Sequence, residues 1–309
     1  MSSPSDPTPA RGPFEVAEVE DFGAADGAPS RVLIEVPHGA TRRADFEALR
    51  AHLRGELPPG LEAYFHVNTD EGAPELALET ARRLAALGVA SLVLRCRVPR
   101  TLIDVNRVVE GEVAAGMSAG LPPYVRDETD RRLLLDLHAR YQREARRLYD
   151  EVCGAGGLAL ALHTYAPRAV EIEVGDDVVA QLRRAYRPAR YARWELRPEI
   201  DLITGAGEGG SLAPPGLPSL LWKSLASAGI EVAENRSYSL HPATTGFTHS
   251  SRWPGQVLCL EVRRDLLGAP WRPFVESRIG SRKVARVARV LAACAAAHVR
   301  AHDGARFTR

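Results

Sequence analysis

The stretch Val32-Leu33-Ile34-Glu35-Val36-Pro37-His38-Gly39 contains the clearest indication of the fold. Its first part, Val32–Val36, is apolar apart from Glu35 and has the length of a buried β-strand, which the following Pro37 ends. Short apolar runs of the same kind recur downstream and alternate with amphipathic segments. This alternation predicts one α/β domain with a central, mostly parallel or mixed sheet flanked by helices.

The remaining elements follow from periodicity and from turn residues. A helical stripe begins at Ala73, with Pro74 suited to the first turn and Gly88 to the end. Further helices are expected at 45–53, 127–150, 218–227 and 273–299, and further strands at 90–94, 158–162, 169–174, 229–233 and 256–262. Residues 184–217 are rich in Arg, Pro and Gly, which predicts an irregular insertion or lid. The domain is expected to span 14–303, after a disordered tail at 1–13.

Composition excludes several classes of protein. The chain of 309 residues is 45% hydrophobic and 26% charged, with 40 basic and 39 acidic residues and a net charge of +1. This balance lacks the basic footprint of a nucleic-acid binder, and no run approaches the roughly 18 apolar residues of a membrane span. The N-terminus has no secretory signal, and the four scattered cysteines are typical of reduced thiols, so we expect a cytoplasmic protein. The sequence indicates no oligomeric state.

Two histidines stand at the ends of predicted strands, His38 and His163. In open α/β sheets, ligands bind beyond the carboxyl ends of the strands, and two imidazoles placed there suit a divalent metal such as zinc. The alternative is that each is a hydrogen-bonded structural histidine. A carboxylate ligand is expected from Asp70 or Glu71, just before the helix at Ala73. The alternative for Asp70 is that it caps this helix.

Two further segments carry candidate functional groups. In Asp104-Val105-Asn106-Arg107, the planar guanidinium of Arg107 suits a substrate carboxylate, with Asp104 and Asn106 orienting it or touching the substrate. The alternative is a solvated surface arginine. Glu261 interrupts the apolar run Gln256–Val262, where a carboxylate is costly unless paired or functional. It is a candidate general base, or it points outward from an alternating strand. Glu35 is a weaker candidate for a supporting role near His38.

Several ordered blocks of the chain resemble the N-formylglutamate amidohydrolase family, whose fold resembles that of the zinc carboxypeptidases. The main blocks are Val36-Pro37-His38-Gly39, Asp104-Val105-Asn106-Arg107, Leu160-Ala161-Leu162-His163-Thr164, and Gln256 to Arg264. Weaker agreement with the family appears at Asp70-Glu71-Gly72-Ala73 and at Asn235, which follows a predicted strand.

The resemblance implies one zinc ion held by His38, His163 and a carboxylate, for which Asp70 is preferred over Glu71. It implies Glu261 as the general base that deprotonates a zinc-activated water, and Arg107 as the anchor of a substrate carboxylate. Asp104, Asn106 and Asn235 are the further substrate-binding candidates. The expected activity is hydrolysis of the amide bond of a small anionic N-formyl or N-acyl amino acid.

The resemblance also has a departure that concerns the substrate. The family's usual Asn-x-Pro-Phe-x-Gly-Gly stretch is replaced here by Asn235-Arg236-Ser237-Tyr238-Ser239-Leu240-His241-Pro242. We expect this loop to line the substrate pocket, and the departure favours an acyl amino acid other than N-formylglutamate. The alternatives are a zinc-dependent peptidase or deacylase acting on another small amide, and a non-catalytic binding descendant of the fold.

Overall fold

A computed structural model describes residues 14–23, 29–109, 118–205 and 210–307. The strands are β1 (Ala17–Phe22), β2 (Val32–Val36), β3 (Ser91–Cys96), β4 (Leu158–Tyr165), β5 (Ile200–Ile203), β6 (Val232–Glu234) and β7 (Val257–Arg263). The helices are α1 (Arg43–Arg50), α2 (Leu61–Asn68), α3 (Ala73–Ala86), α4 (Glu128–Gly154), α5 (Val178–Ala185), α6 (Pro188–Tyr191), α7 (Leu217–Ser227), α8 (Thr245–Arg252), α9 (Arg264–Leu267) and α10 (Ser281–Phe307). The predicted tail at 1–13 lies outside the described residues.

The strands form one seven-stranded mixed sheet in the order β1-β3-β2-β4-β7-β5-β6. The strands β3, β2, β4 and β7 are mutually parallel, whereas β1 pairs antiparallel with β3, and β5 pairs antiparallel with β7. The prediction of an α/β fold with a mixed sheet is therefore confirmed. The carboxyl ends of the four central strands meet at one edge of the sheet, which is where such folds place their ligands.

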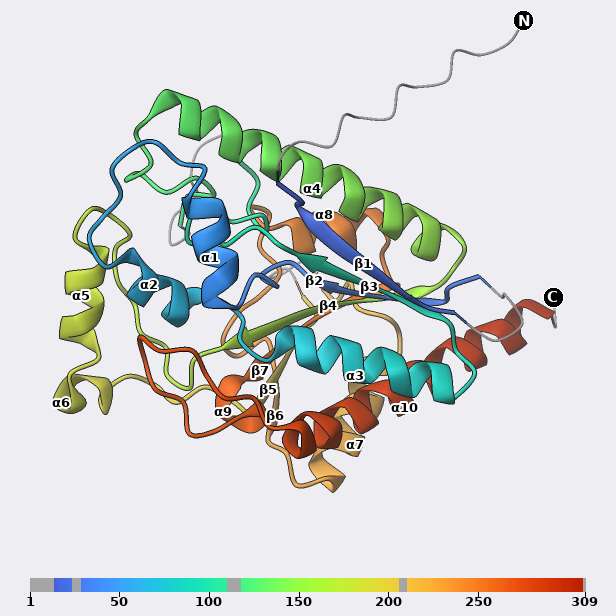
Figure 1. The fold of residues 1–309 in the computed structure, drawn as a ribbon. Helices are drawn as coiled ribbons and strands as arrows, with labels where there is room; N and C mark the ends of the chain where they lie inside the picture. The colour runs from blue at the N-terminus through green and yellow to red at the C-terminus, as the bar shows by residue number, and fades with distance from the viewer. Residues whose placement is uncertain (1–13, 24–28, 110–117, 206–209, 308–309) are drawn as a thin grey trace, which may run out of the picture.

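Helices cover both faces of this sheet (Figure 1). The long helix α4 and the short α8 lie on one face, and α3, α7 and α10 lie on the other. The side chains of β2 alternate between the two apolar cores: Leu33 belongs to the first, and its neighbours Val32 and Ile34 to the second. A strand buried on both faces needs an almost continuous apolar sequence, and this explains the composition of Val32–Val36.

Two predicted elements are wrong. Residues 169–174 form no strand; Ile172 and Val174 are partly buried against the core, and the segment lines a cavity instead of pairing in the sheet. The last helix begins at Ser281 rather than near 273, because Phe274 has a positive φ of 70° and residues 267–280 fold back through backbone hydrogen bonds. Within 184–217, the predicted irregular insertion, Ile200–Ile203 forms β5 and joins the central sheet.

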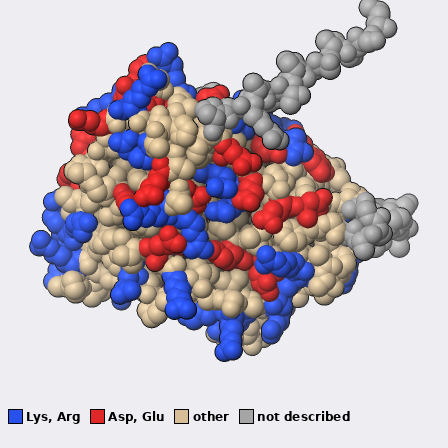
Figure 2. Space-filling model, in the orientation of Figure 1, with Lys and Arg blue, Asp and Glu red and all other residues tan. Residues whose placement is uncertain are grey.

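Figure 2 shows acidic and basic side chains interspersed over the face in view, as expected of a chain whose net charge is +1. None of the helices in the described part of the chain combines the length and the apolar composition that a membrane span requires.

Gly39 lets the turn after β2 pass close to β3. A Cβ atom at this position would lie 2.5 Å from Cγ of Arg95 and 2.9 Å from the carbonyl oxygen of Cys96. We expect Gly39→Ala to lower the free energy of unfolding by about 1–3 kcal/mol, because the added methyl group overpacks the turn that carries His38. Urea denaturation measures the difference. Gly175→Ala is the control, since nothing lies within 4 Å of its Cβ position; equal stability of the two variants would contradict the packing argument.

Candidate active site

Three side chains from distant parts of the chain converge at the carboxyl edge of the sheet. His38 follows β2, His163 lies near the end of β4, and Asp70 lies in the turn between α2 and α3. Nδ1 of His163 is 3.2 Å from Nδ1 of His38 and 3.0 Å from Oδ2 of Asp70, and Nδ1 of His38 is 3.2 Å from the same oxygen. All three residues are buried. The structure thus brings together the residues that were predicted to hold a metal.

This donor set fits a divalent cation. The Nδ1 atoms of the two histidines and one carboxylate oxygen of Asp70 form a triangle of potential ligand atoms. Zinc bonds to nitrogen and oxygen are about 2.0–2.2 Å long, and tetrahedral geometry then separates ligand atoms by about 3.3–3.6 Å. The observed separations of 3.0–3.2 Å are close to this value. Burial alone would raise the pKa of Asp70, but the neighbouring His38 and His163 lower it well below its usual range, so that the carboxylate is ionised.

The two adjacent acids, Asp70 and Glu71, point in different directions. The carboxylate of Glu71 accepts hydrogen bonds from the backbone N–H and the hydroxyl of Ser277, away from the two histidines. Helix α3 has Gly72 as its N-cap and receives no capping hydrogen bond from a side chain, so Asp70 is not used as a helix cap. The geometry therefore distinguishes between the two carboxylates, where the sequence left both open.

Asp104 positions His38. Its Oδ1 is 2.8 Å from Nε2 of His38, and its Oδ2 accepts a hydrogen bond of 2.8 Å from Arg100. Burial opposes ionisation of Asp104, but Arg100 and then His38 outweigh it and hold the pKa well below the usual value. A carboxylate on the second nitrogen of a histidine is a common device for orienting a metal ligand. Asp104 was predicted as a substrate-binding residue, but its oxygens are used inside the protein.

Glu261 stands next to the convergent triad. It pairs with His163 in the register of the parallel strands β4 and β7, and it lines the two cavities described below rather than the outer surface. Its Oε2 atom is shielded from solvent and has no hydrogen-bond partner among the described residues. Burial raises the pKa of Glu261 to about 7. A carboxyl group with these properties is suited to exchanging protons near neutral pH.

Two adjoining cavities open beside this group. The larger measures about 570 Å³ and the smaller about 150 Å³, and both are lined by Arg100, Arg107, Tyr238 and Glu261. His38 and His163 line the smaller one. Residues 236–241 line one or both cavities, so the loop in which the sequence departs from its resemblance lies against the site.

The other residues that were predicted to bind substrate differ in whether they line these cavities. Arg107 lines both cavities, its Nε atom has no partner, and its Nη1 donates to the carbonyl oxygen of Asn106. Asn106 also lines the smaller cavity, but its side-chain oxygen accepts hydrogen bonds from Thr245 and Gly246. Asn235 lines neither cavity: its amide holds the backbone and hydroxyl of Thr204, and its φ of 53° marks a tight turn. The structure therefore gives no support to Asn235 as a substrate-binding residue.

Glu35 and Arg100 also differ from expectation. Glu35 accepts hydrogen bonds from the hydroxyls of Tyr141 and Tyr149 on α4 and so supports the core rather than His38. Arg100 was not predicted, although its spacing of four residues from Asp104 was a usable signal. Tyr238, another unpredicted lining residue, carried no signal beyond its place in the divergent loop.

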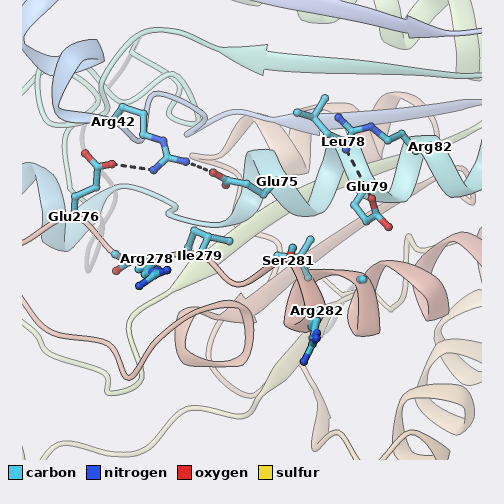
Figure 3. A pocket seen from close by; sticks show the side chains of 13 residues that line it. Arg42, Glu75, Leu78, Glu79, Arg82, Glu276, Arg278, Ile279, Ser281 and Arg282 are labelled. Carbon is cyan, nitrogen blue, oxygen red and sulfur yellow. Dashed lines mark hydrogen bonds and ion pairs between the residues drawn. The ribbon is translucent and has the colours of Figure 1, made fainter.

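A third cavity lies away from the candidate site. It measures about 900 Å³ and lies between α3 and the start of α10 (Figure 3). Arg42 bridges Glu75 and Glu276 across it, and Arg82 faces Glu79. None of the three convergent residues lines this cavity, and its charged groups largely pair with one another, so it is not the candidate site.

Comparison with known proteins agrees with this geometry. The sequence model of the family described as N-formylglutamate amidohydrolase matches residues 30–267. No curated protein matches the chain. Among solved structures, an N-formylglutamate amidohydrolase from Ralstonia eutropha JMP134 is similar at a TM-score of 0.55 and 19% identity, covering 92% of this chain and 99% of that one.

Two more solved structures complete the comparison. A gene product of Agrobacterium tumefaciens has a TM-score of 0.55 at 16% identity and covers 94% of this chain and 97% of that one. A metallo-carboxypeptidase from Burkholderia cenocepacia reaches a TM-score of only 0.37 at 11% identity, covering 94% of this chain and 66% of that one. The last value is too low to support an argument, and at these identities the first two similarities establish the fold alone. The family match extends over more than half of the chain and includes His38, Asp70, His163 and Glu261, and the chain therefore belongs to the N-formylglutamate amidohydrolase family.

Proposed function

We propose that the protein is a metal-dependent amidohydrolase that cleaves the amide bond of a small anionic N-formyl or N-acyl amino acid. His38, Asp70 and His163 would hold one zinc ion. A bound zinc ion supplies Lewis-acid activation of water and of the amide carbonyl. The observation that carries the proposal is the convergence of three buried metal-type donor atoms within 3.2 Å of one another, beside Glu261.

Glu261 is the proposed general base. Its unpartnered Oε2 accepts a proton from the attacking water, and the same carboxyl group then delivers that proton to the leaving amine nitrogen. Its place on β7, paired with His163 on β4, holds this group beside the reaction centre without the use of a flexible loop. Proton transfer of this kind contributes a rate factor of about 10²–10⁴.

Arg107 is the proposed anchor of the substrate carboxylate. It lines both cavities, and none of the described carboxylates forms an ion pair with it. A planar guanidinium binds a carboxylate through two parallel hydrogen bonds, and this fixes the orientation of the amide relative to Glu261. Asp104 holds the ring of His38 in place from the opposite side.

Removal of metal tests the proposal directly. Protein treated with a chelator is expected to lose at least about 100-fold in the rate of formate release from N-formyl-L-glutamate, and one equivalent of zinc is expected to restore it. Formate and free glutamate are quantified together, so that their equal appearance reports cleavage of the amide bond. Full activity in protein shown to be free of metal would contradict the proposal.

A second candidate function is hydrolysis of a different small amide by the same residues. The larger cavity of about 570 Å³ lies within the range that accepts drug-sized ligands, and the loop at 236–241 departs from the family pattern. A panel of N-formyl, N-acetyl and dipeptide substrates distinguishes a deformylase from a broader deacylase or peptidase. A chain that binds these compounds without turnover would be a non-catalytic member of the family.

A further inference from the structure

The larger cavity contains a buried arginine without a matching acid. Arg264, the first residue of α9, is 3% exposed and is among the residues that line the cavity. Its Nη1 donates a hydrogen bond of 2.7 Å to the carbonyl oxygen of Val67 at the end of α2, and its Nε has no partner. No carboxylate in the described parts of the chain forms an ion pair with it. Because a buried charge is costly unless it is paired, a single neutral acceptor leaves the positive charge of Arg264 without a counter-charge.

Apart from Arg107, which is the proposed anchor of the first carboxylate, the other arginines of this cavity have partners within the protein. Arg100 forms an ion pair with Asp104, and Arg236 forms one with Glu195. Arg197 donates to the hydroxyl of Tyr238 and lies over two tyrosine rings, and the half-buried Arg168 donates to the carbonyl oxygen of Trp194. Arg264 is thus the most deeply buried arginine of the cavity, and like Arg107 it forms no ion pair with a described carboxylate.

The surroundings of Arg264 lead to the same conclusion. Glu71, which lies close enough to influence it, gives both oxygens to Ser277. Burial lowers the pKa of Arg264 overall, whereas for Arg100 the opposing effect of burial is outweighed by Asp104 and Asp70, which raise its pKa. The protein therefore supplies a counter-charge for the part-buried Arg100 but none for the buried Arg264. An anionic ligand would supply the missing counter-charge.

We propose that Arg264 is a specificity-determining residue that binds a second carboxylate of the substrate, in addition to the one held by Arg107. The inference rests on the proposed function for the identity of the reaction, but the anion subsite is a separate claim. Val67, Leu182 and Tyr186 also line this cavity, so the second carboxylate is carried on an aliphatic arm that contacts apolar side chains. The preferred substrate is then an N-acyl amino acid with an acidic side chain, and its neutral amide counterpart is a poor substrate.

The test compares ligands that differ only in that second carboxylate. Binding of glutarate and of its monoamide is measured by calorimetry on metal-loaded protein, and kcat/KM is measured for N-formylglutamate and N-formylglutamine. We expect the wild type to prefer the diacid by about 10- to 100-fold in both measurements, and Arg264→Met to remove this preference. Arg264→Lys, which keeps the charge, is expected to retain part of it. Arg168→Met is the matched control and is expected to keep the full preference.

Each outcome bears on one of the two claims. Arg264 also ties α2 to α9, and a merely structural role would lower stability and weaken both ligands alike, leaving their ratio unchanged. An unchanged ratio in Arg264→Met, or a wild type that shows no preference for the diacid, overturns the anion subsite and leaves the hydrolase proposal standing. A preference for glutarate that depends on Arg264, in a protein that hydrolyses no N-acyl compound, supports the subsite and overturns the proposed reaction.

Discussion

Replacing His163 by alanine is expected to remove stoichiometric metal binding and to lower kcat/KM by at least about 10³-fold. The expectation follows from the triangle formed by His38, Asp70 and His163, in which His163 approaches both other donors. Two remaining protein ligands hold a divalent ion weakly, and each 1.36 kcal/mol lost from transition-state stabilisation costs a factor of about ten. The substitution also removes the hydrogen-bonding contact between His163 and the buried carboxylate of Asp70.

The measurement is metal content per chain after dialysis, followed by steady-state kinetics on the same sample. His52→Ala is the control, because His52 is exposed on the surface, where its ring meets the carbonyl oxygen of Ala48 and the ring of Phe14. Circular dichroism and thermal unfolding show whether the variants remain folded. A folded His163→Ala protein that still binds one metal ion per chain and turns over substrate normally would refute the assignment of the ligands.

Replacing Glu261 by glutamine is expected to separate metal binding from catalysis. Glutamine keeps the shape of the side chain but accepts no proton, so kcat is expected to fall by about 10²–10⁴-fold. Metal content is expected to remain unchanged, because Glu261 is not one of the three converging donors. The free energy of unfolding is not expected to fall, since the buried Oε2 has no partner to lose.

Glu171→Gln provides the matched control for this second experiment. Glu171 lines the same larger cavity but is exposed. Its substitution is expected to change kcat by less than about threefold, because the exposed Glu171 is not among the groups that converge beside Glu261. Wild-type turnover in Glu261→Gln would show that another group transfers the proton, and loss of metal from this variant would show that Glu261 is itself a ligand.

The elements that could be predicted are those in which one physical requirement determines the residue types. Val32–Val36 is apolar because both of its faces are buried, and the stripe that begins at Ala73 is apolar because one side of α3 packs on the sheet. The prediction of a strand at 169–174 was wrong because Ile172 and Val174 pack against the core from a segment that does not pair in the sheet. The edge strand β1 was missed because its sequence, AEVEDF, is largely polar and its residues are half-buried or exposed.

The candidate site also contains residues whose position could be predicted from the sequence and residues whose position could not. His38, His163 and Glu261 stand on or next to strands whose direction places them at one edge, so their convergence could be predicted from topology. The choice between Asp70 and Glu71 depends on the local backbone rotation, which adjacent residues in a sequence do not reveal. Asp104 and Asn235 were assigned to substrate, although their polar atoms are used within the protein, and Arg264 was missed because its isolation is a property of the packed interior.

The pairing of His163 with Glu261 across β4 and β7 has a consequence for how this family can diversify. Both groups lie on paired strands of the sheet, whereas the loop at 236–241 lines the cavities that are proposed to bind the acyl amino acid. Mutations in that loop can exchange one substrate for another without disturbing the spacing on which bond cleavage depends. Substrate specificity can therefore change through the loop at 236–241 while the proposed catalytic groups on the sheet keep their positions.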